Sequence, residues 1–485
     1  MHKRVSGYLI LIFGLQLLLS SCSEPAEEKE NGSVQLTVLY TNDEHGWIEE
    51  TASADGAAKL MGVWQEKEGY DPDDPSYLIL SGGDNWTGPA ISTWFQGEST
   101  LEVMNAMHYD ATAIGNHEFD FTIDGLKQLI DLADFPYLSA NIRLKGTDSI
   151  PDFVKPYVIL DIEGVNVGII GLTTLSASYS TFPTYVEDLD FIDYADALQD
   201  YVPELWEAGA DLILCVAHIC YGEAVGLVDV AQDLGVSMIG GGHCNELEAE
   251  VFNESVAVVE GGWRMASYAR VDLYYDAEQA EVTVIEVQTS ANSGGSPDQN
   301  VTDIVSIWQQ ATQAALGEVV GYASADIAQW STELRNLVTD SWLVAFPTAD
   351  IAVTNAGGIR QAIAAGDITK GDIVGVLPFN NNILELKLTG AEVIDCIGSN
   401  LILAGMTTVN GYKHADGTPL EMDSVYSVLT TDYLYYQETL NFNLFDPSPY
   451  FTGLNYHQPT VDYIVSLNTS ASDPLNNYLD NSARR

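Results

Sequence analysis

The stretch ATAIGNHEFD, residues 111–120, joins a short apolar run to a cluster of polar side chains behind a glycine. Asn116, His117 and Asp120 place a carboxamide, an imidazole and a carboxylate within five residues. The apolar residues before them are typical of a buried strand. Polar groups that directly follow buried strands are common at ligand sites of α/β proteins. The stretch therefore predicts a functional loop at the end of a strand.

Similar apolar runs recur along residues 34–290, and helical patterns such as 123–133 and 194–209 lie between several of them. The runs that end in turn residues are VQLTVLYT, SYLILSG, ATAIG, VNVGIIGLT, DLILCVAH and VSMIGGG. Continuous apolar strands that alternate with helices indicate sheets covered on both faces. We therefore expect an α/β domain that ends in strand-rich sequence near residue 290.

The composition divides the chain into two folded parts. A chain of 485 residues is long enough for two or three domains. Residues 291–300, ANSGGSPDQN, have the composition of a loop, and a helical pattern follows them. We predict a first domain at 34–293, a linker helix or hinge at 294–322, a second α+β domain at 323–470, and a tail at 471–485 whose last residues, LDNSARR, fray.

The first residues have the pattern of an export signal. A basic start, an apolar run and LSSC ending at Cys22 resemble a bacterial lipoprotein signal peptide at residues 1–21, in which this cysteine carries the lipid. An ordinary secretory signal is the alternative. Residues 22–33 are polar and acidic, like a flexible tether. These features predict an exported lipoprotein of the cell envelope, on the periplasmic face or the surface of the outer membrane.

The chain is strongly acidic. Eighteen basic residues and 70 acidic residues give a net charge of −52. This charge repels nucleic acid polymers, so we expect no polymer partner. A phosphorylated substrate would also be repelled unless cations were bound locally, which favours a metal at any phosphate site. A solvated surface that serves solubility is the simpler interpretation of the charge. The sequence leaves the oligomeric state open.

The cysteines other than Cys22 are too few for a disulfide scaffold. Cys215 and Cys396 lie in apolar runs, as core residues do. Cys220 and Cys244 flank two histidines. These two either form a disulfide or remain small loop residues.

Candidate metal ligands follow five of the predicted strands. They are Asp43, His45, Asp84, Asn116, His117, His218, His243 and Asn245. Sites in open α/β sheets lie beyond the carboxyl ends of strands, so we expect these side chains to meet. Carboxylates with imidazoles suit Zn²⁺, Mn²⁺ or iron rather than a calcium cage. The two oxygens of Asp84 can bridge two ions, and ions about 3.5–4 Å apart can clamp a phosphoryl group.

The ordered motifs TNDEHG, GGDNWTG, GNHEFD, AHICYG and GGHCNE resemble those of the calcineurin-like metallophosphoesterase superfamily. More narrowly, they are similar to the exported bacterial 5'-nucleotidases, a family that includes UDP-sugar hydrolases and 2',3'-cyclic phosphodiesterases. Residues 354–390, TNAGGIRQAIAAGDITKGDIVGVLPFNNNILELKLTG, resemble the C-terminal substrate domain of that family. The likeness spans about 34–470. It implies a four-layer α/β/β/α sandwich followed by an α+β substrate domain.

The resemblance also implies roles for individual residues. Two divalent ions, Zn²⁺, Mn²⁺ or similar, would share Asp84, and His117 with Asp120 would form the catalytic pair. The first ion site comprises Asp43, His45, Asp84 and Asn245, and the second comprises Asp84, Asn116, His218 and His243. Asn245 stands where relatives carry His, Gln or Asn, and its carbonyl binds metal more weakly than an imidazole does.

The resemblance implies nucleoside-binding residues in the second domain. These are Asn355, Gly357, Arg360, Phe379 and Tyr433. Phe379 and Tyr433 would hold the base between them, because stacking on an aromatic ring suits every base. The family's GGDG turn is absent from residues 430–451, where Glu438 is the candidate to replace its carboxylate. A second family arginine also has no counterpart, and Arg335 is the candidate to replace it.

Together these features predict a dimetal phosphomonoester hydrolase that releases phosphate from 5'-nucleotides outside the cytoplasm by means of a metal-activated water. The second domain would rotate about residues 294–322, as in relatives. One alternative is a hydrolase of a cyclic nucleotide, a nucleotide sugar or a non-nucleotide phosphate. An alternative of another class is a surface lipoprotein that binds nucleotides without turnover. Metal content separates the last alternative from the enzymes.

Overall fold

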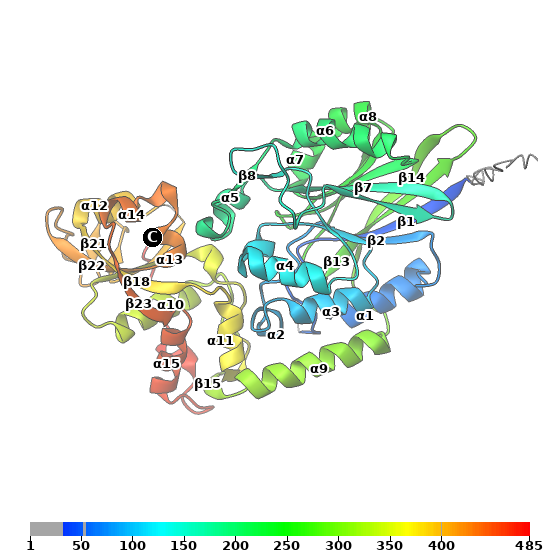
Figure 1. Cartoon of the computed structure of the whole chain (residues 1–485). Coiled ribbons are helices and arrows are strands. Elements are labelled where there is room, and N and C mark those ends of the chain that lie inside the picture. Colours follow the sequence, from blue (N-terminus) through cyan, green and yellow to red (C-terminus); the bar gives the residue numbers. More distant parts are fainter. Residues whose placement is uncertain (1–32, 52–54, 399) are drawn as a thin grey trace, which may run out of the picture.

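The computed structural model describes residues 33–51, 55–398 and 400–485. The predicted signal peptide, the lipid-bearing Cys22 and the tether up to residue 32 lie outside the described residues. Figure 1 shows two domains, the first coloured blue to green and the second yellow to red, with helix α9 running along one side of the first domain toward the second. Within the described ranges, no helix has the length and apolar character that a membrane crossing requires.

The first domain contains two six-stranded sheets. One has the order β14-β13-β1-β2-β3-β4, and the other has the order β11-β12-β10-β9-β7-β6. The strands of the first sheet are β1 (Val34–Thr41), β2 (Tyr77–Ser81), β3 (Ala111–Ala113), β4 (Tyr137–Leu138), β13 (Ser267–Asp276) and β14 (Glu281–Ala291). Those of the second are β6 (Tyr157–Ile162), β7 (Val165–Thr173), β9 (Leu212–His218), β10 (Val236–Gly240), β11 (Leu247–Phe252) and β12 (Val256–Gly261). Strands β1 to β4 are parallel, as are β7, β9, β10 and β12, so their carboxyl ends lie at one edge of each sheet.

Helices cover the outer faces of the two sheets, and apolar side chains fill the space between the sheets. Leu36 and Val38 of the first sheet pack with Val167 and Val216 of the second. Helices α1 (Gly56–Val63), α3 (Glu98–Ala106) and α4 (Thr122–Leu132) pack on the first sheet, and α6 (Tyr194–Glu207), α7 (Tyr221–Gly226) and α8 (Val228–Leu234) pack on the second. Shorter elements are η1 (Trp64–Glu68), α2 (Ala90–Thr93), η2 (His117–Phe119), β5 (Ile142–Leu144), α5 (Ala177–Ser180), η3 (Pro183–Tyr185) and β8 (Leu189–Phe191). The predicted four-layer α/β/β/α sandwich is confirmed.

The second domain is built on a five-stranded sheet of order β19-β16-β22-β18-β23. Its strands are β16 (Ile351–Asn355), β18 (Asn382–Thr389), β19 (Leu401–Ala404), β22 (Val425–Thr431) and β23 (Tyr450–Asn455). Helices α10 (Thr332–Ala345) and α15 (Gln458–Leu467) pack on one face, and α12 (Gly390–Cys396), α13 (Asp432–Tyr435) and α14 (Phe442–Phe445) pack on the other. The remaining elements are β15 (Val319–Ala323), η4 (Ala356–Gly358), β17 (Gly366–Thr369), α11 (Lys370–Val376), β20 (Met406–Thr407), β21 (Lys413–His414), η5 (Glu438–Leu440) and η6 (Leu475–Tyr478). The predicted α+β character is confirmed.

Helix α9 (Gln299–Leu316) is fastened to the first domain. Val301 and Val305 join the core beneath α1 and α3. The ring of Trp308 lies 4.9 Å from that of Phe95, and Trp308 Nε1 donates a hydrogen bond to Glu102 Oε2 at 2.8 Å. Most of the predicted 294–322 linker is therefore part of the first domain's packing. A hinge within residues 294–322 stays a prediction.

The end of the chain does not fray as predicted. Arg484 forms a bidentate ion pair with Asp340 of α10, with N–O distances of 2.8 and 2.7 Å. Asn336 Nδ2 donates to the backbone oxygen of Asp480 at 2.9 Å, and Leu475 is fully buried in the core of the second domain. The tail is held because it supplies both a buried apolar side chain and a partner for a helix carboxylate.

Gly62 lies where α1 meets the 291–300 loop, and no larger residue fits there. A Cβ at Gly62 would lie 1.7 Å from the backbone oxygen of Ser296. Gly→Ala inside a helix normally stabilises by about 1 kcal/mol. Here we expect Gly62→Ala to lower the free energy of unfolding by about 1–3 kcal/mol through overpacking. Urea unfolding measures the change.

The matched control is Gly222→Ala in α7, where a Cβ would meet nothing within 4 Å. This variant should be neutral or more stable than the wild type. Equal changes in the two variants would contradict the packing argument.

Candidate active site

Loops that follow strands of both sheets bring the predicted ligands to one edge of the first domain. Asp43 and His45 follow β1, Asp84 follows β2, Asn116 and His117 follow β3, His218 ends β9, and His243 and Asn245 follow β10. Most of these side chains are buried, and His218 is fully so. His243 is half-buried and Asn245 is exposed. The predicted convergence at the carboxyl ends of the strands is therefore observed.

The backbone at this edge adopts conformations that few residue types tolerate. Five of the predicted ligands have positive φ: Asp43 (52°), His45 (45°), Asp84 (57°), His243 (73°) and Asn245 (58°). Asp, Asn and His are the non-glycine residues most often found in this region. Such backbone strain is concentrated at functional sites, where the surrounding structure enforces it. The glycine of the GNHEFD stretch is needed as well, because a Cβ at Gly115 would lie 2.2 Å from Asp84 Oδ1.

One group of possible ligands comprises Asp84, His218 and His243, whose ligand atoms all lie within 4.8 Å of one another. His218 Nε2 is 3.0 Å from Asp84 Oδ2, and His243 Nδ1 is 3.2 Å from His218 Nε2. The backbone oxygen of Gly82 lies 2.8 Å from His218 Nδ1 and can only accept, so it places the proton on Nδ1. This arrangement leaves Nε2 facing the cluster, as in histidines that bind metals.

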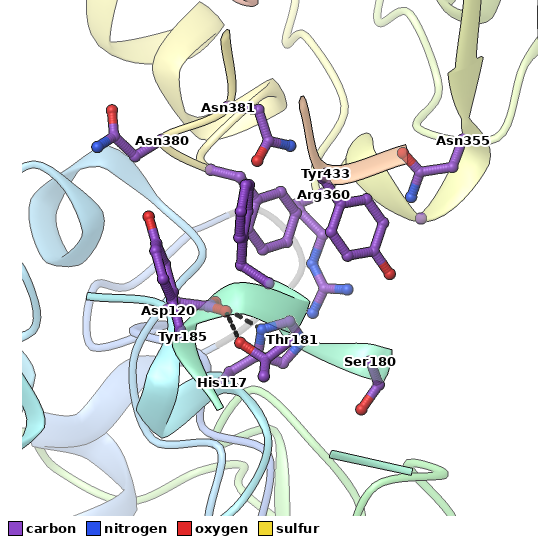
Figure 2. Close-up of a pocket in the computed structure, with 13 residues that line it drawn as sticks. His117, Asp120, Ser180, Thr181, Tyr185, Asn355, Arg360, Asn380, Asn381 and Tyr433 are labelled. Carbon is purple, nitrogen blue, oxygen red and sulfur yellow. Dashed lines mark hydrogen bonds and ion pairs between the residues drawn. The ribbon is translucent and has the colours of Figure 1, made fainter. Parts of the chain in front are cut away.

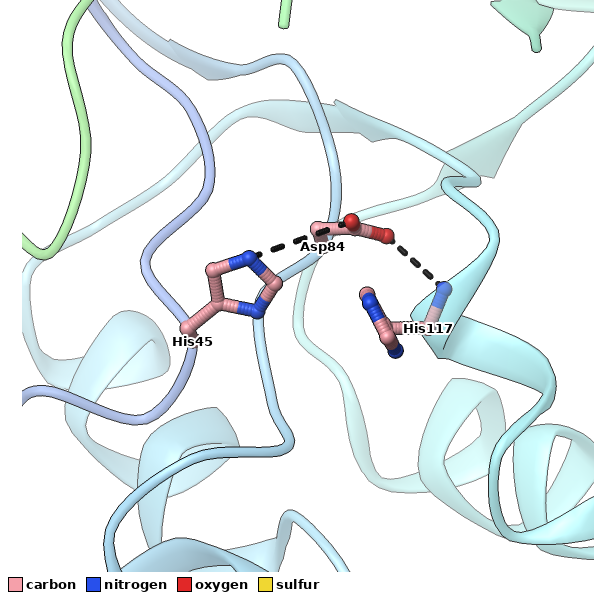
Figure 3. A group of neighbouring side chains, drawn as sticks. All are labelled: His45, Asp84 and His117. Atoms are coloured by element: carbon pink, nitrogen blue, oxygen red, sulfur yellow. Dashed lines mark hydrogen bonds and ion pairs between the residues drawn. The ribbon is translucent and has the colours of Figure 1, made fainter. Parts of the chain in front are cut away.

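A second group comprises His45, Asp84 and His117 (Figure 3). His45 Nε2 is 4.0 Å from Asp84 Oδ2 and 3.6 Å from Asp43 Oδ1. Arg360 of the second domain contacts the same nitrogen, with Nη2 at 3.1 Å. A guanidinium only donates, so His45 Nε2 is the accepting, unprotonated nitrogen, which is the form in which a histidine binds a metal. Asp84 is common to both groups, while its sharing between two ions stays a prediction.

Charge in the cluster favours neutral imidazoles at two of the three histidines. Burial and the nearby Arg360 lower the pKa of His45 well below its usual value. Burial and the neighbouring His218 lower the pKa of His243 to about 4. Burial alone would also lower the pKa of His218, but the carboxylate of Asp84 outweighs it and raises that pKa to about 10. Metal-binding histidines must be neutral, and a cation on Asp84 would replace the proton that His218 carries here.

The two predicted carboxamide ligands differ in their surroundings. The Oδ1 of Asn116 is buried and has no hydrogen-bond partner in the described part of the chain. An orphaned buried oxygen is costly unless a ligand satisfies it, so Asn116 fits a metal site. Asn245 is exposed, and the structure records no hydrogen bond of its side chain to a described residue. Its predicted role as a ligand stays a prediction.

His117 and Asp120 form a close pair beside the two groups. His117 Nδ1 lies 2.6 Å from Asp120 Oδ2, and Thr181 Oγ1 donates to Asp120 Oδ1 at 3.2 Å. Burial alone would lower the pKa of His117, but the carboxylates of Asp120 and Asp84 outweigh it and raise that pKa. The imidazole also stacks on Phe379 of the second domain, with ring centroids 5.7 Å apart. The structure thus brings together the predicted pair.

A cavity of about 150 Å³ opens from this pair into the interface between the domains (Figure 2). All five residues predicted to bind the nucleoside line it: Asn355, Gly357, Arg360, Phe379 and Tyr433. Other lining residues were not predicted, namely Ser180, Thr181, Phe182, Tyr185, Asn380 and Asn381. Four of these lie in the loop after β7, where the aromatic-rich run YSTFPTY beyond a strand end was the available signal.

Known proteins share this architecture. Residues 310–405 match the family model described as 5'-nucleotidase, C-terminal domain. A 5'-nucleotidase from Vibrio parahaemolyticus is 27% identical over 483 residues, which are 87% of this chain and 85% of that protein. A 5'-nucleotidase precursor from Thermus thermophilus has the same fold, with a TM-score of 0.77 and 22% identity over 93% of this chain and 98% of that one. Residues 310–405 thus carry the C-terminal domain of the 5'-nucleotidase family, and the chain is similar to 5'-nucleotidases over most of its length.

The likeness to these 5'-nucleotidases indicates a hydrolase of the metallophosphoesterase type. The family uses divalent metals, and the two groups that share Asp84 are the candidate ligands here. Relatives also differ in length. A Bacillus subtilis protein named endonuclease YhcR is 26% identical over 496 residues, but the match covers 89% of this chain and only 40% of that protein.

Two substitutes proposed for missing family residues are wrong. Neither Glu438, which is exposed, nor Arg335 is among the residues that line the cavity. The additional arginine near the site is Arg264 of the first domain, whose Nη2 donates to the backbone oxygen of Arg360 at 2.8 Å. Its guanidinium lies between two indoles, 4.3 Å from the ring of Trp47 and 3.7 Å from that of Trp263. No sequence motif pointed to Arg264, because it follows β12, a strand after which none of the predicted ligands lies.

Glu118, which the sequence analysis did not identify, holds two of the predicted ligand loops in place. Its buried carboxylate accepts hydrogen bonds from the backbone nitrogens of Asp84 (2.8 Å), Asn85 (2.8 Å) and Gly115 (2.6 Å). Burial and the charge of Asp84 raise the pKa of Glu118 to about 8. Because one carboxyl group ties the loops after β2 and β3 together, it fixes the spacing between Asp84 and Asn116.

Cys220 and Cys244 form a disulfide, which settles the alternative that the sequence left open. Cys215 and Cys396 are free and buried, as predicted. The disulfide joins the loop after β9 to the loop that carries His243 and Asn245.

We expect Cys220→Ser/Cys244→Ser to lower the free energy of unfolding by about 2–4 kcal/mol, because the unfolded chain is no longer cross-linked. Urea unfolding measures this loss.

Dithiothreitol provides the control. The reductant should lower the urea midpoint of the wild type toward that of the double variant and leave the double variant unchanged. If the wild type and the double variant unfolded at the same urea concentration without reductant, the stabilising role would be refuted.

Proposed function

We propose that this protein is a two-metal phosphomonoesterase that releases phosphate from 5'-nucleotides outside the cytoplasm. The observation that carries the proposal is Asp84, which is shared by two groups of ligands beside the His117–Asp120 pair. That pair faces a cavity lined by aromatic rings and carboxamides. A catalytic centre of this kind next to a pocket for a planar ligand suits a nucleotide.

The candidate metal ligands divide into two sets that share one carboxylate. Asp43, His45, Asp84 and Asn245 would hold one ion, and Asp84, Asn116, His218 and His243 would hold the other. When bound, two divalent ions such as Zn²⁺ or Mn²⁺ activate a water and neutralise phosphoryl charge. The orphaned oxygen of Asn116 and the unprotonated Nε2 of His45 are the features that fit this assignment.

His117 is placed to stabilise charge on the phosphoryl group or to donate a proton to the leaving ester oxygen. Asp120 accepts from Nδ1, which orients the ring and favours the imidazolium. The guanidinium of Arg360 lies within 3.1 Å of His45 and lines the cavity, where it can bind phosphate oxygens. Phe379 and Tyr433 line the same cavity and offer stacking surface to a base.

A phosphate-release panel tests the proposal. The purified chain, supplied with Mn²⁺ or Zn²⁺, is assayed on 5'-nucleotides, cyclic nucleotides, UDP-sugars and sugar phosphates. We expect the highest kcat/KM with 5'-nucleotides and a metal content of about two ions per chain. Higher activity on another substrate class would replace the nucleotide assignment. Nucleotide binding without metal or turnover would instead indicate a binding protein.

We also propose that Cys22 carries a lipid anchor, on the basis of the LSSC motif alone. The expected result is that the wild type fractionates with membranes and Cys22→Ala does not. Equal distribution of the two proteins would rule out the anchor.

A further inference from the structure

Residues 174–186, which we call the bridging segment, connect β7 to β8 and carry α5 and η3. Thr181 Oγ1 donates to Asp120 Oδ1 at 3.2 Å, and Ser176 Oγ lies 3.2 Å from His243 Nε2. Thr181 is buried. One side of the bridging segment is therefore in contact with the candidate catalytic pair and with a candidate metal ligand.

The other side of the bridging segment contacts the second domain. The backbone oxygen of Tyr179 accepts two hydrogen bonds, from Tyr433 Oη at 3.2 Å and from Gln437 Nε2 at 3.0 Å. Both donors lie in or just after α13, which follows the central strand β22. The first of these bonds holds the Tyr433 hydroxyl, so a residue of the first domain orients a residue that lines the cavity.

Phe182 is the centre of an aromatic group formed by both domains. Its ring stacks on that of Tyr185 with centroids 4.7 Å apart, and it packs against Tyr436 at 5.9 Å and Tyr433 at 6.5 Å. The side chain is half-buried, and Phe182 lines the cavity together with Phe379. The first domain thus contributes aromatic surface to the same pocket as the second domain does.

The cavity has the chemistry of a site for a heteroaromatic base. Aromatic rings supply apolar, planar surface, and the carboxamides of Asn355, Asn380 and Asn381 supply both donors and acceptors for the polar edge of a base. The one carboxylate in the lining, Asp120, already accepts from His117 and Thr181. Recognition in this pocket therefore depends on stacking and on neutral hydrogen bonds.

We propose that Phe182 is a base-contacting residue that favours substrates carrying a base over phosphates without one, so that the base site is complete only when both domains contribute to it. This inference rests on the proposed nucleotidase function. It follows that the base is held fully only in the domain arrangement seen here. In that arrangement Thr181 of the same segment contacts Asp120, so base recognition and the position of the catalytic pair depend on one short stretch of chain.

The test compares ligands with and without a base. In Phe182→Ala we expect adenosine, measured by titration calorimetry, to bind about 5- to 150-fold more weakly, the effect of losing one stacking partner. The kcat/KM for AMP should fall within the same range, mainly through KM, while hydrolysis of ribose 5-phosphate stays at the wild-type rate. Phe182→Tyr, which keeps the π face, should restore adenosine binding.

Two further variants test whether lost side-chain volume, lower stability or the loss of any aromatic ring would explain the result. Phe182→Leu keeps much of the side-chain volume and should lose adenosine binding while keeping the wild-type melting temperature. Phe451→Ala removes an exposed ring of the second domain outside the cavity lining and should bind adenosine normally.

The proposal is overturned if Phe182→Ala and Phe182→Leu bind adenosine as the wild type does. A parallel fall in ribose 5-phosphate turnover would also overturn it, because the ring would then act on the catalytic centre. If the wild type releases phosphate from AMP but does not bind adenosine, the role of Phe182 fails and the nucleotidase function stands. If the wild type binds adenosine through Phe182 but releases no phosphate, the nucleotidase function fails instead.

Discussion

Replacing His117 with alanine is expected to lower kcat for nucleotide hydrolysis by about 10²–10⁴-fold, the usual contribution of a general acid or base. The imidazole is held on one side by Asp120 at 2.6 Å and on the other by the ring of Phe379. Its Nδ1 is therefore engaged, and only Nε2 can reach a substrate. Phosphate release under saturating substrate measures the loss.

The same variant also decides between two interpretations of His117. The structure places this residue in a possible ligand group with His45 and Asp84. If His117 acts on the substrate, His117→Ala should keep about two metal ions per chain, measured by elemental analysis. Loss of an ion would make it a ligand. His108→Asn, at an exposed histidine, is the control and should retain full turnover.

Asp84→Asn is expected to have the largest effect of any single substitution. Asp84 is the one residue common to both ligand groups, and its Oδ1 also accepts from the backbone nitrogen of His117 at 2.8 Å. Asparagine preserves the size and that hydrogen bond but removes the charge that attracts both cations. We expect metal content to fall below one ion per chain and turnover to fall by roughly 10³-fold or more, since a bound metal supplies several kcal/mol and each 1.36 kcal/mol is a factor of ten in rate.

The control for this variant is Asp110→Asn, which also replaces a largely buried aspartate near a strand. Asp110 Oδ2 accepts from the backbone nitrogen of Ile79 at 2.7 Å, an interaction that an asparagine oxygen can maintain. This control should keep both metals and full activity. An Asp84→Asn protein with two ions and normal turnover would show that the shared carboxylate is not the centre of the site.

The first domain was predictable because its strands are continuous apolar runs. Val165–Thr173 and Leu212–His218, for example, appear as strands at the places that their composition indicated. The convergence of Asp43, Asp84 and His218 was predictable for the same reason, since parallel strands deliver their carboxyl ends to one edge.

Residues whose roles depend on the second domain were not predictable in this way. Arg264 and Phe182 lie in loops without a recognised motif, and each also contacts the other domain. The pairing of Cys220 with Cys244 was equally open, because two cysteines beside histidines fit either a disulfide or free thiols. The distance between such residues in the folded protein decides whether they interact, and their spacing along the sequence does not reveal that distance.

The architecture and the set of candidate ligands could be read from the amino-acid order, because hydrophobic periodicity and strand-end motifs are local properties of the chain. Only the folded molecule showed three features. They are the walls of the pocket, the position of Arg264 beside Arg360 and the attachment of the C-terminal tail. These features depend on contacts between segments more than a hundred residues apart, such as Tyr179 with Tyr433 and Arg484 with Asp340. The free energy of those contacts depends on packing geometry, which exists only once both domains have folded.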